Sequence, residues 1–471
     1  MIFTSPVFLM LFLPFMLGAY AVVPHRLRRW AICLFSLLFY TCASFHHPAS
    51  LAFLIVCACF TYCAACAVVA TGSRRIFGCA VLLITGALIV LRAVSFFSSE
   101  GALPFLPLGA AFYLLSCISC IVDVRRGDAV VNGFFDVFLY VSYFPVLIAG
   151  PVIKYKDFVS LTKEEKIEFN AVNMGVGVRT FALGFIKRVA VAQVLLESYE
   201  RIAGSLSLEA GERISIGVMS ILVLLLLVGV YFAFSGFSDM GRGLSAMLGI
   251  PLESDFGNCF LSATPSDYFK NFLKSLWLWM KDYLRAPIEC RFGKDRRIVR
   301  IASAAAVCVA IMLWYRASPQ MLLLMIPIII FVVLDRAFSL KKRFSQNLLA
   351  RAVGVLLTVV CVAIFWVLIK SRNVNMLINA ISGYSPAPSL QSYNMFMTVF
   401  SPELIAVCAL IFFIMLPQIF AARKKPVSKR AADIFSWSWT SVVVIVFVIT
   451  LLFVMPQYPE LATTPFWDIS L

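Results

Sequence analysis

Several features common in water-soluble proteins are missing from this sequence. It has no long polar segment that could form a soluble domain, no low-complexity stretch and no clear internal repeat. Charged residues make up only 14% of the 471 residues, hydrophobic residues make up 62%, and the mean hydropathy is +0.94. This is far too much apolar surface for one water-soluble core. The chain is therefore predicted to be a polytopic protein surrounded by lipid bilayer.

Histidine is also scarce, which limits the chemistry open to the chain. There are only three, His25, His46 and His47, and all lie near the ends of the first two apolar runs. Histidine is the side chain whose ordinary pKa best suits a general base near neutral pH. A reaction centre elsewhere in the chain would need another base, unless the fold brings an outer loop inward.

The net charge of +16 reflects short clusters of Lys and Arg between apolar runs. Membrane proteins place such clusters on the cytoplasmic side, so the charge indicates topology and no nucleic-acid partner. Most of the 14 cysteines lie within apolar runs and are predicted to be small buried residues. The pairs Cys63 with Cys66 and Cys117 with Cys120 have no nearby histidine to complete a ligand set, so no metal site is predicted.

Apolar runs of spanning length recur along the whole chain. The first, Ile2 to Val23, begins without positive charge and precedes the basic residues up to Arg29, which predicts a span with its N-terminus outside. The other predicted spans are Trp30 to Phe45, Ala49 to Ala70, Ile76 to Phe97, Pro104 to Val122, Ile214 to Ala233, Ile301 to Trp314, Met321 to Leu334, Val353 to Ile369, Leu404 to Ala421 and Trp437 to Val454.

The fold class predicted from these runs is an all-α integral membrane protein. Residues 1–471 are expected to form a single domain of roughly 11 to 13 transmembrane helices, at about 20 residues per span, with both termini extracytoplasmic. Re-entrant and interfacial helices are expected around a central cavity. The stretch from Tyr143 to Pro151 is one such segment, because Pro145, Gly150 and Pro151 break a helix. Broken backbone at membrane depth is tolerated only inside protein or beside a cavity.

The densest polar stretch runs from Phe232 to Trp314. Asp239 and Arg242 lie at i, i+3 among small residues, so they could form either a structural ion pair between helices or part of a functional site. Farther along, Tyr268 to Tyr283 mixes aromatic and charged residues and predicts a helix at the interface or entering the interior. Upstream, Lys187 and Arg188 are explained by a basic helix end anchored in anionic headgroups.

Together these stretches resemble the membrane-bound O-acyltransferase family, in particular its bacterial branch that O-acetylates alginate and related exopolysaccharides. The residues that carry the resemblance are Tyr143 to Pro151, Phe234 to Leu248, Phe272-Leu273 with Ser275, Trp279, Lys281, Asp282 and Tyr283, and Leu313 to Ala317. At the two positions where the family has histidine, this chain has Leu273 and Tyr315. The second of these is the position that the family ties to catalysis.

The resemblance implies candidate site residues. Candidates for catalysis are Tyr315, Leu273, Asp239, Ser275 and Asp282; candidates for lining the cavity or the re-entrant segment are Pro145, Gly150, Pro151, Trp279, Trp314 and Arg316. Tyr315 is a poor base, since an ordinary tyrosine pKa of about 10 leaves roughly one molecule in a thousand ionised at pH 7, a cost of about 4 kcal/mol. A buried carboxylate, Asp239 or Asp282, is another conceivable base.

Two hypotheses about function follow. In the first, the protein passes an acyl group, acetyl by analogy with the branch, from a cytoplasmic thioester (acyl-CoA or an acyl carrier) to an extracytoplasmic glycan or relay protein. It would bind no permanent cofactor, would lie in the bacterial inner membrane, and could work with a glycan-modifying partner. In the second, it is a catalytically silent member that serves as scaffold, partner or passage. A solute transporter is less favoured, because paired repeats with matching broken helices are not evident.

Overall fold

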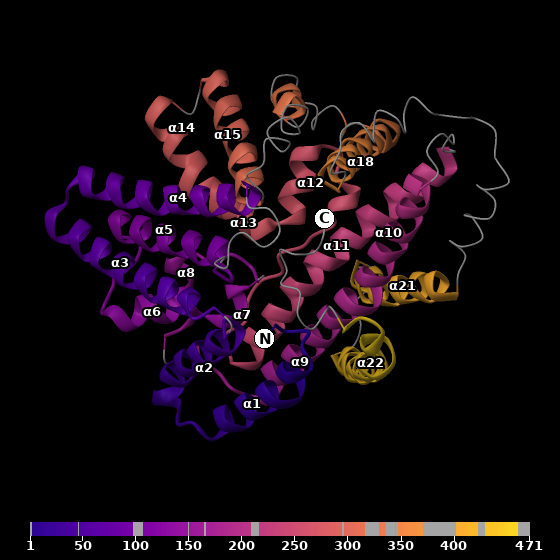
Figure 1. The fold of residues 1–471 in the computed structure, drawn as a ribbon, viewed down its shortest axis with the longest axis horizontal. Coiled ribbons are helices and arrows are strands. Elements are labelled where there is room, and N and C mark those ends of the chain that lie inside the picture. Colours follow the sequence, from indigo (N-terminus) through magenta and orange to yellow (C-terminus); the bar gives the residue numbers. More distant parts are fainter. Residues whose placement is uncertain are drawn as a thin grey trace. The chain divides into compact units, whose positions relative to one another are not determined.

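The computed structural model describes the chain in twelve stretches: residues 2–45, 47–97, 107–148, 150–163, 166–208, 216–293, 296–315, 329–335, 344, 347–370, 402–422 and 429–459. Within these stretches the regular structure is helical and there is no strand, so the predicted all-α class is confirmed (Figure 1). The chain divides into two compact units. Unit 1 is Met1–Gly177 with Gly241–Cys361, and unit 2 is Val178–Met240 with Val362–Leu471.

The first part of unit 1 is a series of apolar helices. They are the π-turn η1 (Phe8–Phe12), α1 (Leu13–Val22), η2 (His25–Leu27), α2 (Arg28–Ala43), α3 (Ala49–Thr71), α4 (Arg74–Phe97), α5 (Ala110–Arg126), α6 (Phe134–Ser142), α7 (Phe144–Leu147) and α8 (Tyr155–Leu161). α5 packs against both α3 and α4, and Figure 1 shows the three lying side by side. This central position buries α5: every described residue from Ala110 to Val124 except Ser116 is buried.

The second part of unit 1 consists of shorter elements. They are η5 (Cys259–Leu261), α12 (Pro265–Phe272), α13 (Lys274–Met280), the π-turn η6 (Lys281–Arg285), α14 (Ala286–Phe292) and α15 (Arg297–Tyr315). Three long helices cross the boundary between the units in sequence: α9 (Ala171–Ile186), α11 (Ile216–Met247) and α18 (Leu348–Lys370). This part carries most of the polar motifs found in the sequence.

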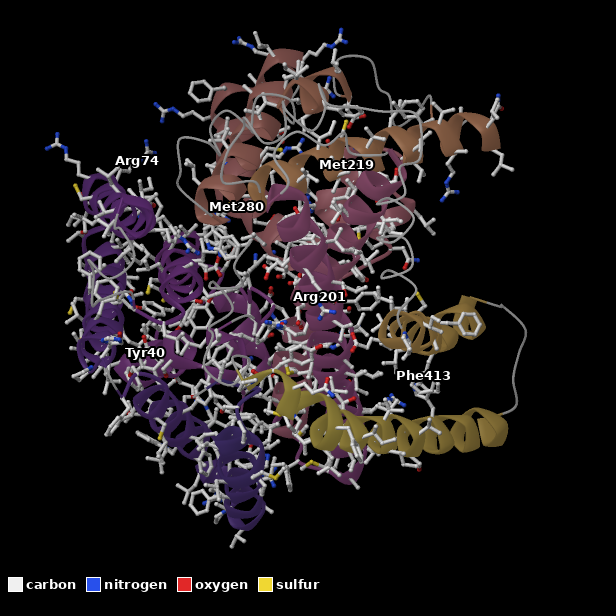
Figure 2. The ribbon with its side chains drawn as sticks, turned by 45° about the vertical axis from the view of Figure 1, so that its right-hand side comes forward. Tyr40, Arg74, Arg201, Met219, Met280 and Phe413 are labelled. Carbon is white, nitrogen blue, oxygen red and sulfur yellow. The ribbon has the colours of Figure 1, made fainter. Side chains whose placement is uncertain are left out.

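Unit 2 is built on aromatic contacts between helices. Its remaining elements are the π-turn η4 (Lys187–Ala192), α10 (Gln193–Leu208), α21 (Pro402–Ala422), α22 (Lys429–Ile449), η7 (Thr450–Val454) and η8 (Met455–Gln457). The ring of Phe185 lies 5.0 Å from that of Phe447, centroid to centroid. Phe413 of α21, labelled in Figure 2, lies 4.4 Å from Trp439 of α22. These contacts hold α9, α21 and α22 in one unit.

Five described helices are long and apolar enough to cross a bilayer. They cover Ala49–Thr71, Arg74–Val94, Met219–Met247, Leu348–Val367 and Trp439–Gln457. Large apolar side chains on α4 point away from the protein, with Leu82 73% and Leu83 61% exposed, as expected of a helix that faces lipid. The chain is therefore a multi-pass membrane protein. The total of 11 to 13 spans stays a prediction, since the predicted span Met321 to Leu334 lies mostly outside the described residues.

Two predicted spans differ in length from the helices that form. The first helical run begins at Pro6 and not at Ile2, because the Ser5 hydroxyl caps it by accepting a hydrogen bond of 3.2 Å from the Phe8 amide. Within the run predicted from Pro104, the described residues 107–109 are not helical and α5 begins at Ala110, directly after Gly109 adopts a left-handed conformation with φ +72°.

Candidate functional site

The stretch from Tyr143 to Pro151 is broken, and two glycines from distant helices press against it. α7 lasts only four residues before the chain turns at Gly150. A Cβ added to Gly241 of α11 would lie 2.3 Å from the carbonyl oxygen of Pro145, and one added to Gly109 would lie 2.4 Å from that of Leu147. Only glycine allows such approaches. The break is thus held from two sides; its position beside a cavity stays a prediction.

A second break occurs at Leu273, where a single helix from Tyr268 to Tyr283 was expected. That expectation is wrong, because α12 ends at Phe272 and α13 begins at Lys274, with Leu273 at φ −140° and ψ 71°. Buried Asp255 caps the new helix: its carboxylate accepts a hydrogen bond of 2.5 Å from the Ser275 amide. Its carbonyl oxygen also accepts one of 2.9 Å from the Lys274 amide.

The two breaks meet along what we call the seam, where residues 152–156 run beside residues 275–283. At one end, the Val152 amide donates a hydrogen bond of 2.8 Å to the Ser275 hydroxyl. Farther along, the Lys154 ammonium forms an ion pair with the Asp282 carboxylate. The seam therefore joins two stretches that are more than a hundred residues apart in the sequence, and it brings together Ser275 and Asp282 from the predicted site.

Asp123 anchors the far end of the seam, and sequence reasoning did not include it among the site residues. It is fully buried near the end of α5. One carboxylate oxygen accepts a hydrogen bond of 2.7 Å from the Tyr283 hydroxyl, and the other accepts one of 3.0 Å from the Lys156 amide. A carboxylate at the end of an otherwise apolar run is the signal that could have identified it.

The π-turn η6 presents both Asp282 and Tyr283 to the seam. Arg126 reinforces it, because its guanidinium donates a hydrogen bond of 2.8 Å to the Asp282 carbonyl oxygen and lies 5.4 Å from the centre of the Tyr283 ring. Burial, and then the hydrogen bond to Asp123, raise the pKa of Tyr283 well above its ordinary value. Tyr283 is thus a neutral hydrogen-bond donor. Single π-turns within helices often occur at functional sites.

The two predicted tryptophans have different surroundings. Trp279 of α13 is buried, with its ring 4.8 Å from that of Tyr283, so it packs beside the seam. Trp314 of α15 donates a hydrogen bond of 2.9 Å to the Ala111 carbonyl oxygen, which ties α15 to α5. Tyr315 is the last residue of α15, and α13 contacts α15. The Tyr315 side chain and Arg316 lie outside the described residues.

Asp239 of α11 lies in unit 2 and forms an ion pair with Lys187, the first residue of the π-turn η4. The Lys187 ammonium is 2.6 Å from its carboxylate, and the two side chains are only 12% and 16% exposed. Arg188 is buried, with its guanidinium 5.3 Å from the centre of the Phe237 ring. The interpretation of Lys187 and Arg188 as an anchor in lipid headgroups is therefore wrong, because both side chains point into the protein.

The histidines that the structure describes are far from the seam residues in sequence. His25 and His47 are exposed at opposite ends of α2, and His46 lies outside the described residues. Among the described residues there is also no group of three or more His, Cys, Asp or Glu side chains that could hold a metal ion. The chemistry of the seam is thus that of Lys–Asp pairs, hydroxyls and aromatic rings.

Comparisons with known proteins identify relatives of this chain. Residues 125–304, which include the whole seam, match the family model of the membrane-bound O-acyltransferase family. The chain is 27% identical over 401 residues to a probable alginate O-acetylase, AlgI, of Pseudomonas syringae pv. tomato, covering 80% of this chain and 73% of that protein. It is 31% identical to the Pseudomonas fluorescens protein of the same name, over 60% of this chain and 56% of the relative.

A more distant relative is the peptidoglycan O-acetyltransferase of Helicobacter pylori. The two chains are 22% identical over 81% of this chain and 79% of that one. This chain thus spans little more than half the length of some of the relatives that it resembles and about three quarters or more of others.

Proposed function

We propose that this chain, which belongs to the membrane-bound O-acyltransferase family, moves an acyl group from a cytoplasmic thioester to an extracytoplasmic polysaccharide or to a relay protein. The names of the relatives, which include alginate O-acetylases and a peptidoglycan O-acetyltransferase, support acetyl as the acyl group and a glycan as the final acceptor. In the proposed topology both termini are extracytoplasmic, residues 1–471 act as one domain, and the membrane is the bacterial inner membrane.

The observation that carries the proposal is the seam itself. It lies within the region that matches the family, and it joins two helix breaks through the Val152–Ser275 hydrogen bond and the Lys154–Asp282 ion pair. Broken backbone at membrane depth is tolerated only where it is buried in protein or lines a cavity, and two breaks placed together are consistent with a cavity at the seam.

The reaction requires one proton transfer. An acceptor hydroxyl oxygen attacks the thioester carbonyl carbon, the carbon–sulfur bond breaks, and the hydroxyl proton passes through a base to the departing thiolate. In this proposal Asp282 and Ser275 position the seam, because their polar atoms are already engaged by Lys154 and Val152. Tyr315, the last residue of α15, is the residue proposed to replace the family histidine as the base.

A catalytically silent protein is the second candidate, and one observation favours it. The helix break at Leu273 offers an apolar side chain where the family resemblance places a histidine. Such a protein would keep the seam as a scaffold, as a docking partner for an active relative, or as a passage for an acyl carrier. Both candidates predict the same fold, so they differ only in activity.

The test is the content of alkali-labile acyl esters on envelope glycans, compared between cells with and without the protein. Active transfer predicts esters that depend on the protein and that fall with Tyr315→Phe. Under the silent hypothesis no esters depend on the protein, and Tyr315→His restores none. Each variant is measured at matched membrane abundance, so that a loss of ester reflects chemistry and not expression.

A further inference from the structure

The turn between α14 and α15 carries an unusual concentration of exposed positive charge. Four arginines lie within ten residues of one another, and all four are exposed: Arg291, Arg296, Arg297 and Arg300. This turn comes immediately before the apolar run Ile301 to Trp314. The arginines therefore lie where α15 would enter the bilayer, at the depth of the lipid headgroups.

The described acidic side chains that lie closest to this turn along the chain are already engaged by other cations. Asp282 of the π-turn η6 pairs with Lys154. Glu289 of α14 is buried and accepts hydrogen bonds from Arg285 at 2.8 Å and from Ser303 at 2.9 Å. None of these carboxylates neutralises the four arginines of the turn. Residues 291–300 contain five Lys and Arg residues against one acidic residue, Asp295, so the turn keeps a net positive charge that an external anion can neutralise.

Two large apolar side chains are exposed on the same turn. Phe292 is 57% exposed and Ile298 is 75% exposed. The Arg291 guanidinium lies 6.0 Å from the centre of the Phe292 ring, so charge and apolar surface are adjacent. Arginine next to exposed aromatic and aliphatic side chains is typical of surfaces that lie in the headgroup and acyl-chain boundary. A small soluble anion would leave these apolar side chains in water, and an acidic protein would need a matching apolar face to cover them.

We infer that the α14–α15 turn is a binding surface for anionic phospholipid headgroups, with the four arginines contacting phosphates and with Phe292 and Ile298 inserted among the acyl chains. The surface is connected to the seam by the buried carboxylate of Glu289. It links Arg285, at the end of the π-turn η6, to Ser303 of α15. The inference does not depend on the proposed function, since it concerns lipid binding and not acyl transfer.

The test measures lipid binding to the full-length protein purified in a neutral detergent. Short-chain phosphatidylglycerol is titrated and the rise in the thermal unfolding midpoint gives the affinity, with short-chain phosphatidylcholine as the zwitterionic reference. The variant Arg296→Gln/Arg297→Gln should bind phosphatidylglycerol roughly 25-fold more weakly, about fivefold for each charge removed. Ile298→Ser should also weaken lipid binding, although it leaves the charge unchanged.

The matched control is Arg74→Gln/Arg75→Gln. These two arginines are also exposed and adjacent, and Figure 2 shows Arg74 at the outer end of α4, but no further basic turn accompanies them. The control should keep the affinity of the unmodified protein. Unchanged affinity in Arg296→Gln/Arg297→Gln, or an equal loss in both double variants, would overturn the inference.

Two further probes separate the sources of negative charge. If inorganic phosphate raises the unfolding midpoint as much as phosphatidylglycerol does, the surface binds a free anion and the lipid assignment is wrong. A polyglutamate peptide that competes with the lipid tests the third source, an acidic protein. An acidic protein is the better occupant if the peptide competes and if Ile298→Ser changes the affinity for neither the peptide nor the lipid. The inference is supported if only phosphatidylglycerol raises the unfolding midpoint and if Ile298→Ser weakens that rise.

Discussion

The Tyr283 hydroxyl donates a hydrogen bond of 2.7 Å to the Asp123 carboxylate, across 160 residues of sequence. This contact closes one end of the seam and joins the π-turn η6 to the most buried helix of unit 1. Because it lies where two distant parts of the chain meet, its removal should affect the geometry of the whole seam.

Replacing Tyr283 by phenylalanine should destabilise the protein by about 1–3 kcal/mol, because it leaves one buried oxygen of Asp123 without its side-chain donor. The free energy of unfolding in detergent measures the loss. Tyr62→Phe on α3 is the control and should change that free energy by less than about 0.5 kcal/mol, because the hydrogen-bond partner of its hydroxyl is the weakly bonding thiol of Cys66. An equal change in the two variants would show that the Tyr283 contact carries no particular weight.

The ion pair in unit 2 makes a different prediction. Lys187→Met leaves the Asp239 carboxylate largely buried without its cation and should cost about 3 kcal/mol of unfolding free energy. The double variant Lys187→Met/Asp239→Leu should recover most of that loss, since no charge then remains to be buried. Arg201→Gln, which removes the exposed Arg201–Glu197 pair, should change the value by about 0.5 kcal/mol or less. No recovery in the double variant would contradict this account.

Close backbone contact at the first break can be tested with one methyl group. Gly241→Ala would place a Cβ 2.3 Å from the Pro145 carbonyl oxygen and should destabilise the protein by about 1–3 kcal/mol through overpacking. Gly18→Ala, in helix α1 with nothing within 4 Å of the added carbon, should instead stabilise it by about 0.5–1 kcal/mol. Thermal unfolding of the two variants in parallel gives the comparison. Opposite signs are expected, and the same sign in both would be evidence against the close approach.

Much of the fold follows from residue patterns that act locally. The apolar run from Ala49 ends at Gly72, a residue with φ +62° that terminates α3, and Pro145 with Gly150 break the chain where the sequence predicts. Such signals depend on neighbours in sequence, which a reader of the sequence can see. The all-α class and most of the described spans were predictable for this reason.

The details of the site depend on partners that are distant in sequence. Nothing near Leu273 predicts a helix break, because the cap comes from Asp255. The partner of Asp239 is likewise invisible locally, since Lys187 lies on another helix. Burial of Arg188 against Phe237 overturned the headgroup interpretation in the same way. Tertiary contacts between helices decide such positions, and the sequence alone does not specify which helices meet.

The measurement that tests the central claim most directly compares two acidic residues in the same region, each paired with a lysine. Asp282 pairs with Lys154 within the seam, and Glu253 pairs with Lys274 on the exposed surface, where its side chain is 87% exposed. Acyl esters on envelope glycans are quantified in cells that carry each variant at equal membrane abundance. We predict at least about a tenfold loss of ester with Asp282→Asn, as expected when a positioning contact of about 1.4 kcal/mol or more is removed, and no loss with Glu253→Gln. Equal ester content in the two variants would contradict the seam as the site of acyl transfer. An ester content that is the same in cells with and without the protein would contradict acyl transfer altogether.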